Sequence, residues 1–344
     1  MEVTSSVELS ARPGPPVLDV VAIGNALVDV IATADDELVE RLGLVKSAMT
    51  LVDLERSRAI YAAMGPTVEI SGGSAANTIA GVASLGGRAG FAGKVAEDQF
   101  GEVFRHDFTQ QDVELDLAVV APSDGGTGRC HVLVTPDAQR TMATHLGVAN
   151  TLVPGDLSGA LFSRTRLTYL EGYLFDLLPA KQAIRDAIEH THASDGLVAL
   201  SLSDSFCVER HRKDFLELVT TQVDVVFANE AEARALFRAT DLADALAAFD
   251  EAGVLAAVTL GPRGVAVVVP AGTVEVPACE VDIVIDANGA GDLFAAGFLY
   301  ALARGGDPVE AARLGSICAA EVIVHSGARP VADLAELATA EGLL

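Results

Sequence analysis

The chain has 344 residues, of which 50% are hydrophobic and 21% charged, enough for one large α/β domain with an appendage or for two modest domains. Its formal net charge is −25, from 48 acidic and 23 basic residues, and so negative a surface is repelled by phosphate backbones and anionic membranes. We therefore expect no nucleic acid and no membrane as a partner.

The cysteines and the N-terminal residues bear on where the protein works. The four cysteines are scattered and form neither a Cys-x-x-Cys metal pair nor a disulfide framework, which favours a reduced, cytoplasmic protein. Residues 1–16 end in the Pro- and Gly-rich stretch Arg12–Pro16 and lack the regions of a signal peptide, so we interpret them as a flexible tail. No apolar run reaches transmembrane length. The folded domain is expected over 17–344.

The first half of this domain reads as strands mixed with short helices. Val17–Ile23 is a near-continuous apolar run, interrupted only by Asp19, between Pro16 and Gly24, which predicts a buried strand. Short apolar runs separated by Gly- and Pro-containing turns predict hairpins between 117 and 144. The other elements predicted in this half are helices over 35–42, 53–64 and 74–85, and strands over 68–71 and 90–95.

The second half alternates strands and helices. Such alternation predicts an α/β fold with a mainly parallel sheet covered by helices on both faces, and the β-rich stretches near 27–71 and 117–147 are expected to form an appended lid. The predicted strands are 167–170, 197–202, 223–227, 256–260, a hairpin over 265–276 and a strand-like run at 281–285; the predicted helices are 179–191, 208–219, 230–237, 242–252, 290–303 and 308–324.

The segment Asp286–Asp292, with the sequence DANGAGD, carries the clearest chemistry. Gly289 and Gly291 let the backbone approach a ligand closely, and the helix that begins here offers free N–H groups to an anion. An aspartate at such a place is suited to accept a proton from a hydroxyl that attacks phosphorus, which makes Asp292 a candidate base. The alternative is that Asp292 only caps its helix.

Two other phosphate-binding motifs are absent from the sequence. Gly93-Lys94 is followed by Val95 and so is not a P-loop. The pair Gly289 and Gly291 lacks the third glycine of a dinucleotide fingerprint, so a dinucleotide-dependent dehydrogenase is only a distant alternative.

Four motifs in order resemble the ribokinase or PfkB-type carbohydrate and nucleoside kinases. The resemblance implies a ribokinase-like three-layer α/β/α domain with a mainly parallel central sheet and a small β-sheet lid. It also implies an ATP-dependent phosphotransferase that uses Mg²⁺, with Asp292 as catalytic base and the amides of Gly289, Ala290 and Gly291 as the anion hole. The motifs are Ser71–Thr78, Asn229–Glu232, Thr259–Gly264 and Asp286–Asp292.

The same resemblance assigns the substrate side. Asn25 and Asp29 are expected at the end of the first strand, where period-2 alternation puts them on one face and an aspartate can accept from two vicinal sugar hydroxyls. Gly72, Gly73 and Asn77 are implied as the second sugar contact. The alternatives are an ordinary turn for the first pair and an ordinary helix start for the others.

The nucleotide side is implied by two further motifs. Asn229 and Glu232 are implied to position Mg²⁺, with Glu232 acting through water, and the alternative is a simple helix-capping pair. Thr259, Gly261 and Gly264 are implied to lie beside the nucleotide.

Two other residues complete the candidate site. Arg140 matches an arginine of adenosine-kinase-like members that reaches the transferring phosphate, although a solvated surface arginine is the alternative. Tyr173 and Phe175 follow a strand at the edge of the site and are candidates to stack on a base, Tyr173 first, and the alternative is that one of them is a core residue.

Within the resembled family, the motifs are more similar to those of adenosine kinases than to those of ribokinases. The resemblance therefore implies a kinase that phosphorylates the 5′-hydroxyl of adenosine or a related purine nucleoside. A ribokinase- or fructokinase-like sugar kinase and a non-catalytic nucleoside-binding protein stay open. Ala287 and Ser201 depart from the family pattern and bear on how ATP is held. The oligomeric state, monomer or homodimer through the lid, and activation by a monovalent cation also stay open.

Overall fold

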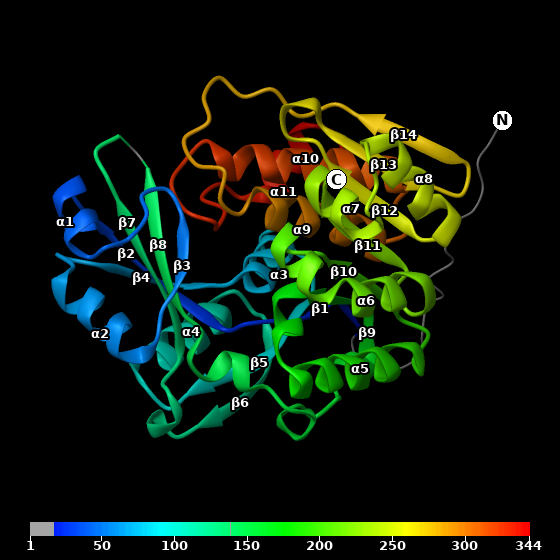
Figure 1. Ribbon diagram of the computed structural model, residues 1–344. Coiled ribbons are helices and arrows are strands. Elements are labelled where there is room, and N and C mark those ends of the chain that lie inside the picture. Colours follow the sequence, from blue (N-terminus) through cyan, green and yellow to red (C-terminus); the bar gives the residue numbers. More distant parts are fainter. Residues whose placement is uncertain (1–16, 138) are drawn as a thin grey trace.

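The computed structural model describes residues 17–137 and 139–344, and it contains two β-sheets with helices packed against them (Figure 1). The larger sheet has nine strands in the order β14-β13-β12-β11-β10-β9-β1-β5-β6. From β12 to β6 all neighbours pair in parallel, and β13 and β14 add an antiparallel hairpin. The strands are β1 Leu18–Ile23, β5 Ala89–Ala96, β6 Glu114–Val120, β9 Thr165–Glu171, β10 Leu197–Ser201, β11 Val225–Asn229, β12 Leu255–Thr259, β13 Val265–Val269 and β14 Gly272–Val276.

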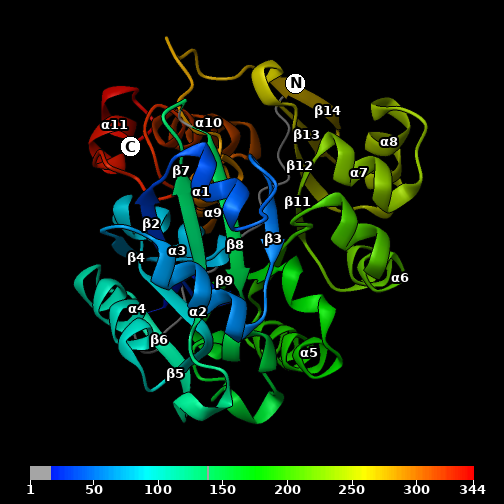
Figure 2. The ribbon, with the colours of Figure 1, turned by 60° about the vertical axis from the view of Figure 1, so that its left-hand side comes forward.

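Helices cover both faces of this sheet, so the domain has three layers (Figure 2). One hydrophobic core joins the sheet to α3, α4, α9, α10 and α11, and the other joins it to α5, α6, α7 and α8. The expected mainly parallel sheet between two helical layers is thereby confirmed. The helices are α3 Ser74–Ser84, α4 Gln99–Gln110, α5 Leu178–His192, α6 Ser205–Thr221, α7 Glu230–Phe237, α8 Leu242–Ala252, α9 Ala290–Ala303, α10 Pro308–Ile323 and α11 Leu334–Ala340.

A smaller sheet stands beside this domain and has five strands in the order β3-β8-β7-β2-β4. Helices α1 Asp36–Arg41 and α2 Leu54–Ala63 lie against it, and Leu38 and Ile60 are buried there with Leu133 and Ala143. The strands are β2 Leu27–Thr33, β3 Met49–Leu51, β4 Val68–Gly72, β7 Gly128–Val134 and β8 Arg140–His145. No helix in the described part of the chain is both long and apolar enough to cross a membrane.

Three expectations need correction. The strand predicted at 117–120 is part of β6 and pairs in parallel with β5, so it belongs to the larger sheet and not to the smaller one. The strand predicted at 281–285 does not form. Its backbone is irregular, the side chains of Ile283 and Val284 are 64% and 57% exposed, and the Ile285 amide donates to the carbonyl of Ile323 in α10. Helix α4 was missed, although its buried face repeats at Phe100, Phe104 and Phe108.

Candidate active site

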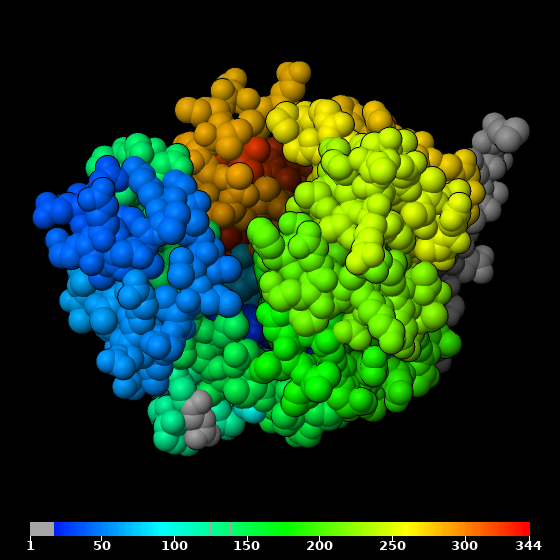
Figure 3. Space-filling model, viewed as in Figure 1, coloured from blue at the N-terminus to red at the C-terminus, as the bar shows by residue number. Residues whose placement is uncertain are grey.

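Several of the predicted site residues lie at the carboxyl ends of the strands of the larger sheet. Glu171, Asn229 and Thr259 are the last residues of the parallel strands β9, β11 and β12, and Asn25 comes two residues after the end of β1. The carboxyl ends of parallel strands are where open α/β sheets bind their ligands. Figure 3 shows a hollow on the surface between the smaller sheet and the larger domain.

Asp292 lies in the first turn of α9 and is held by α3. The Ser74 hydroxyl donates to its Oδ1 at 2.7 Å, and the Asn77 amide donates to its Oδ2 at 2.9 Å. Thr78 Oγ1 donates to its main-chain carbonyl at 3.1 Å. Since α9 has no side-chain cap, Asp292 is not a capping residue here. Asn77, which the sequence placed on the sugar, is thus a partner of the candidate base.

The surroundings of Asp292 suit a proton acceptor next to an anion. Burial raises the pKa of Asp292, while the bonds from Ser74 and Asn77 and the charge of Arg329 oppose that rise. A base works best when its pKa lies near the working pH. At Gly291 a Cβ would meet no atom within 4 Å, so this part of the helix N-terminus is open to a ligand.

Gly289 has a different reason for being glycine. It is the N-cap of α9 with φ 79°, and a Cβ there would lie 2.7 Å from the Cα of Ala328. The turn therefore needs glycine for its backbone as well as for its space. Ala290, between the two glycines, donates its amide to the carbonyl of Ala287 at 3.3 Å.

Asp29 does not lie on the first strand, as the sequence suggested, but on β2 of the smaller sheet. The chain leaves the larger sheet after Ile23, so strand alternation cannot relate Asp29 to Asn25. Gly72 lies on β4, the strand that pairs with β2. A Cβ at Gly72 would lie 2.6 Å from the Asp29 carboxyl carbon. In the described residues no donor is hydrogen-bonded to the Asp29 carboxylate, which leaves it available to hydroxyl groups.

Burial raises the pKa of Asp29 to about 6, although the charges of Arg329 and Arg140 lower it and that of Asp292 raises it further. The carboxylates of Asp29 and Asp292 are therefore close enough to interact electrostatically. One carboxylate comes from β2 of the smaller sheet and the other from helix α9 of the larger domain, and both face one site.

Glu171 joins the two sides of the site, and the sequence analysis missed it. Its Oε1 accepts from the Asn25 amide side chain at 2.6 Å, and its Oε2 accepts from the Ala75 backbone at 3.0 Å. Burial raises the pKa of Glu171 to about 7. Gly73 packs so tightly here that a Cβ would lie 2.4 Å from the Asn25 carbonyl oxygen. A charged residue at the end of the apolar strand Thr165–Glu171 was the available signal.

Asn229 and Glu232 form a capping box at the start of α7. The Asn229 side chain accepts from the Glu232 amide at 2.9 Å, and both Glu232 oxygens accept from Asn229, at 2.6 and 2.9 Å. Burial raises the pKa of Glu232 to about 7. The described residues contain no cluster of three metal-ligating side chains. Each Glu232 oxygen already accepts one hydrogen bond, an arrangement that suits contact with a metal through water.

The Thr259–Gly264 motif has mixed roles. Thr259 donates to the Ala228 carbonyl at 3.4 Å, next to the start of α7. A Cβ on Gly261, which has φ 60°, would meet no atom within 4 Å. Gly264 is structural, since a Cβ would lie 2.0 Å from the Val276 carbonyl in the hairpin. Gly261 is thus the glycine of this motif that is free to meet a ligand.

Arg140 is buried and not a surface residue. Its guanidinium forms a 2.9 Å ion pair with Asp286, and the two side chains are only 9% and 8% exposed. One of its nitrogens, Nη2, is buried without a partner among the described residues. Arg140 lies on β8, so its ion pair with Asp286 links the smaller sheet to the Asp286–Asp292 segment. Its charge also lowers the pKa of Asp29.

Tyr173 and Phe175 differ in their surroundings. Tyr173 is half-buried, donates to the Ser203 carbonyl at 3.3 Å, and has its pKa raised by burial and by carboxylates that include Glu171 and Asp292. Phe175 is 3% exposed and packs on Phe215 with 4.6 Å between ring centroids. Only Tyr173 is placed to meet a ligand.

The chain is similar to known proteins over most of its length. The family model described as pfkB family carbohydrate kinase matches residues 18–334. The adenosine kinase of Saccharomyces cerevisiae is 31% identical over 329 residues, which cover 89% of this chain and 95% of that protein.

Two solved structures are similar over almost the whole chain. The adenosine kinase of Sinorhizobium meliloti has 46% identity and a TM-score of 0.86, covering 94% of this chain and 99% of its own. A probable sugar kinase protein from Rhizobium etli has 40% identity and a TM-score of 0.88, covering 96% and 100%.

Proposed function

Because the chain belongs to the pfkB family of carbohydrate kinases, and so is a phosphotransferase with a hydroxyl acceptor and a ribokinase-like fold, we propose that it transfers the ATP γ-phosphate to the 5′-hydroxyl of adenosine or a related purine nucleoside. One observation carries the proposal. Asp292 is held by two donors from α3, beside the open first turn of α9 and within electrostatic reach of Asp29.

In this proposal Asp292 is the general base. The 5′-hydroxyl gives its proton to the Asp292 carboxylate while its oxygen forms the new bond to the γ-phosphorus. The bond from that phosphorus to the oxygen bridging to the β-phosphate breaks, and ADP leaves with the electron pair. The backbone amides of Gly289, Gly291 and Asp292 stabilise the charge on the transferring group, whereas the Ala290 amide already donates to the carbonyl of Ala287.

The nucleoside lies between the two sheets. Asp29 accepts hydrogen bonds from the vicinal ribose hydroxyls, an arrangement supported by its unpartnered carboxylate. Tyr173 borders the base, and the free nitrogen of Arg140 points to a role in neutralising the phosphate. The smaller sheet acts as a lid that keeps water from hydrolysing ATP.

ATP lies on the side of Asn229, Glu232 and Gly261. Mg²⁺, when bound, supplies positive charge that offsets the phosphate charge. Asn229 and Glu232 would hold it through water, since each Glu232 oxygen already accepts one hydrogen bond from Asn229.

A free sugar is the second candidate acceptor. The similarity to the probable sugar kinase of Rhizobium etli favours it, and Asp29 would accept from the diol of a sugar in the same way. The two candidates differ in whether the space next to Tyr173 admits a purine.

The test is ADP release with Mg·ATP across a panel of nucleosides and sugars, for the wild type, Asp292→Asn and a control, Asp250→Asn, on the exposed face of α8. We expect turnover with adenosine that falls by about 10²–10⁴-fold in Asp292→Asn and stays unchanged in the control. Turnover with sugars alone would replace the acceptor. An Asp292→Asn variant as active as the wild type would refute the base.

A further inference from the structure

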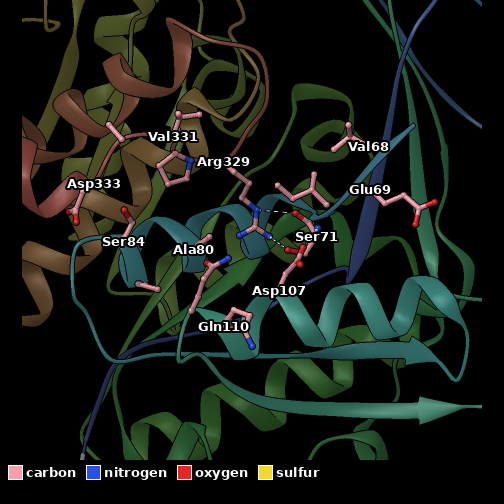
Figure 4. A pocket seen from close by; sticks show the side chains of 15 residues that line it. Val68, Glu69, Ser71, Ala80, Ser84, Asp107, Gln110, Arg329, Val331 and Asp333 are labelled. Carbon is pink, nitrogen blue, oxygen red and sulfur yellow. Dashed lines mark hydrogen bonds between the residues drawn. The ribbon is translucent and has the colours of Figure 1, made fainter. Parts of the chain in front are cut away.

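Arg329 lies in the segment between α10 and α11, which no motif marked. Its Nε donates to the carbonyl of Ser71 at 2.9 Å, and its Nη2 donates to the Ser71 hydroxyl at 3.0 Å (Figure 4). The Ser71 amide in turn donates to Asp107 in α4 at 2.8 Å. All the polar atoms of Ser71 are therefore held by partners outside the smaller sheet.

The position of Ser71 explains why this grip matters. Ser71 belongs to β4, the edge strand of the smaller sheet, and is the residue before Gly72, which packs on the Asp29 carboxylate. The guanidinium of Arg329 also lies 4.9 Å from the centre of the Phe108 ring, a cation–π contact that fixes its plane. Arg329 thus fixes the strand end that approaches Asp29 most closely.

Arg329 also sets the local charge. Burial lowers its pKa to about 10, so it stays protonated at neutral pH. The groups that act electrostatically on Asp29 come from three other elements: Arg329 and Arg140 favour its ionised form, and Asp292 opposes it. Cys130 on β7, which also faces Asp29, stays a neutral thiol because burial raises its pKa to about 12.

We propose that Arg329 is a positioning residue for the acceptor, which holds the Ser71–Gly72 strand end in place and keeps the Asp29 carboxylate ionised to receive a vicinal diol. The inference rests on the proposed function, because it assigns Asp29 to the acceptor. Arg329 acts through Ser71 and Asp29 and has no part in moving the phosphate.

The choice of variants follows from the surroundings. Arg329 lines a cavity of about 820 Å³ together with Val68, Asp107 and Gln110, so truncation to alanine would enlarge that cavity and disturb packing (Figure 4). Lysine keeps the positive charge but loses the paired hydrogen bonds from the guanidinium to Ser71, whereas glutamine loses the charge and keeps a hydrogen-bond donor. Arg129 is a matched control because it also donates to a serine, at 2.8 Å, and lies over the ring of Phe100.

The experiment measures KM for acceptor and for ATP, kcat from pH 5 to 9, acceptor Kd by calorimetry and Tm for the wild type, Arg329→Gln, Arg329→Lys and Arg129→Lys. We expect Arg329→Gln to raise acceptor KM and Kd by about 10- to 100-fold, with ATP KM unchanged. The acid limb of kcat/KM should move to higher pH in Arg329→Gln and stay in place in Arg329→Lys.

Two results would overturn the inference. One is that Arg329→Gln changes Tm alone, with KM, Kd and the acid limb as in Arg129→Lys. The other is an equal loss of kcat in both Arg329 variants with acceptor Kd unchanged. The Kd readout separates the two proposals: a wild type that binds nucleoside without turnover refutes the kinase assignment, while Kd still tests Arg329. A wild type that binds no acceptor overturns both.

Discussion

Replacing Glu232 by glutamine should stabilise the ligand-free protein, and the gain should depend on pH. Glu232 is 6% exposed, and burial raises its folded-state pKa to about 7 from the ordinary 4.5. An acid with a raised folded pKa binds its proton more tightly when folded. Its favourable contribution is therefore complete below about pH 4.5 and is lost as the pH rises through about 7.

The size of the effect follows from the two pKa values. The difference between about 7 and 4.5 corresponds to about 3 kcal/mol, since each pKa unit is worth about 1.36 kcal/mol. Glutamine carries no charge at any pH, but its amide nitrogen cannot accept one of the two hydrogen bonds from Asn229, a loss of about 1 kcal/mol that does not depend on pH. The stability of the variant relative to the wild type should therefore rise by about 2 to 3 kcal/mol between pH 5 and pH 8.5.

The assay is urea unfolding of both proteins at pH 5 and pH 8.5. Glu209→Gln is the control, because Glu209 is exposed on α6. Asp29 and Glu171 titrate in the same range in both proteins, so their contributions cancel in the comparison. A stability gain that is equal at the two pH values, or equal to that of the control, would refute the reasoning that the buried charge is the cause.

Three further outcomes are expected. Gly291→Ala should keep the wild-type Tm and lose at least about tenfold in kcat/KM for ATP, whereas Gly289→Ala should lower Tm because of its positive φ and the contact with Ala328. A calorimetric scan and steady-state kinetics of both variants check this contrast, and equal losses of Tm in the two variants would contradict it. The wild-type kcat/KM for acceptor should fall as the pH drops below about 6, where Asp29 takes up a proton, and a profile flat down to pH 5 would speak against its role. Arg140→Gln should reduce kcat by about tenfold or more, and it should also lower Tm because it leaves Asp286 buried without its partner; unchanged values of both would remove Arg140 from the site.

The periodicity of the sequence was enough to predict the larger sheet and its two helical layers. Strands such as Leu18–Ile23 and Val225–Asn229 are short apolar runs, and amphipathic helices lie between them. The strand predicted at 281–285 was wrong because a pattern of apolar residues does not say whether a neighbouring strand is available for pairing. Here the nearest partner is the Ile323 carbonyl of a helix, and no strand forms.

The site was predicted in part, because motifs name residues but do not say which atoms meet. The glycines, Asp29 and Asp292 could be named from their motifs. That Asn77 donates to Asp292, and that Glu171 receives both Asn25 and Ala75, depends on the side-by-side placement of strands far apart in the chain. Arg329 carries no local signal, since its partner Ser71 lies 258 residues away in sequence.

The first turn of α3 has a consequence for protein engineering. Ser74 and Asn77 grip Asp292, while the Ala75 amide between them binds Glu171, and β4 enters this turn directly through Gly73. A chimera that receives the smaller sheet of a relative should therefore keep its own residues 73–78 together with α9 and β9. A junction placed at the obvious sheet boundary would instead exchange the donors that hold Asp292, and under the proposed function it would uncouple acceptor specificity from turnover.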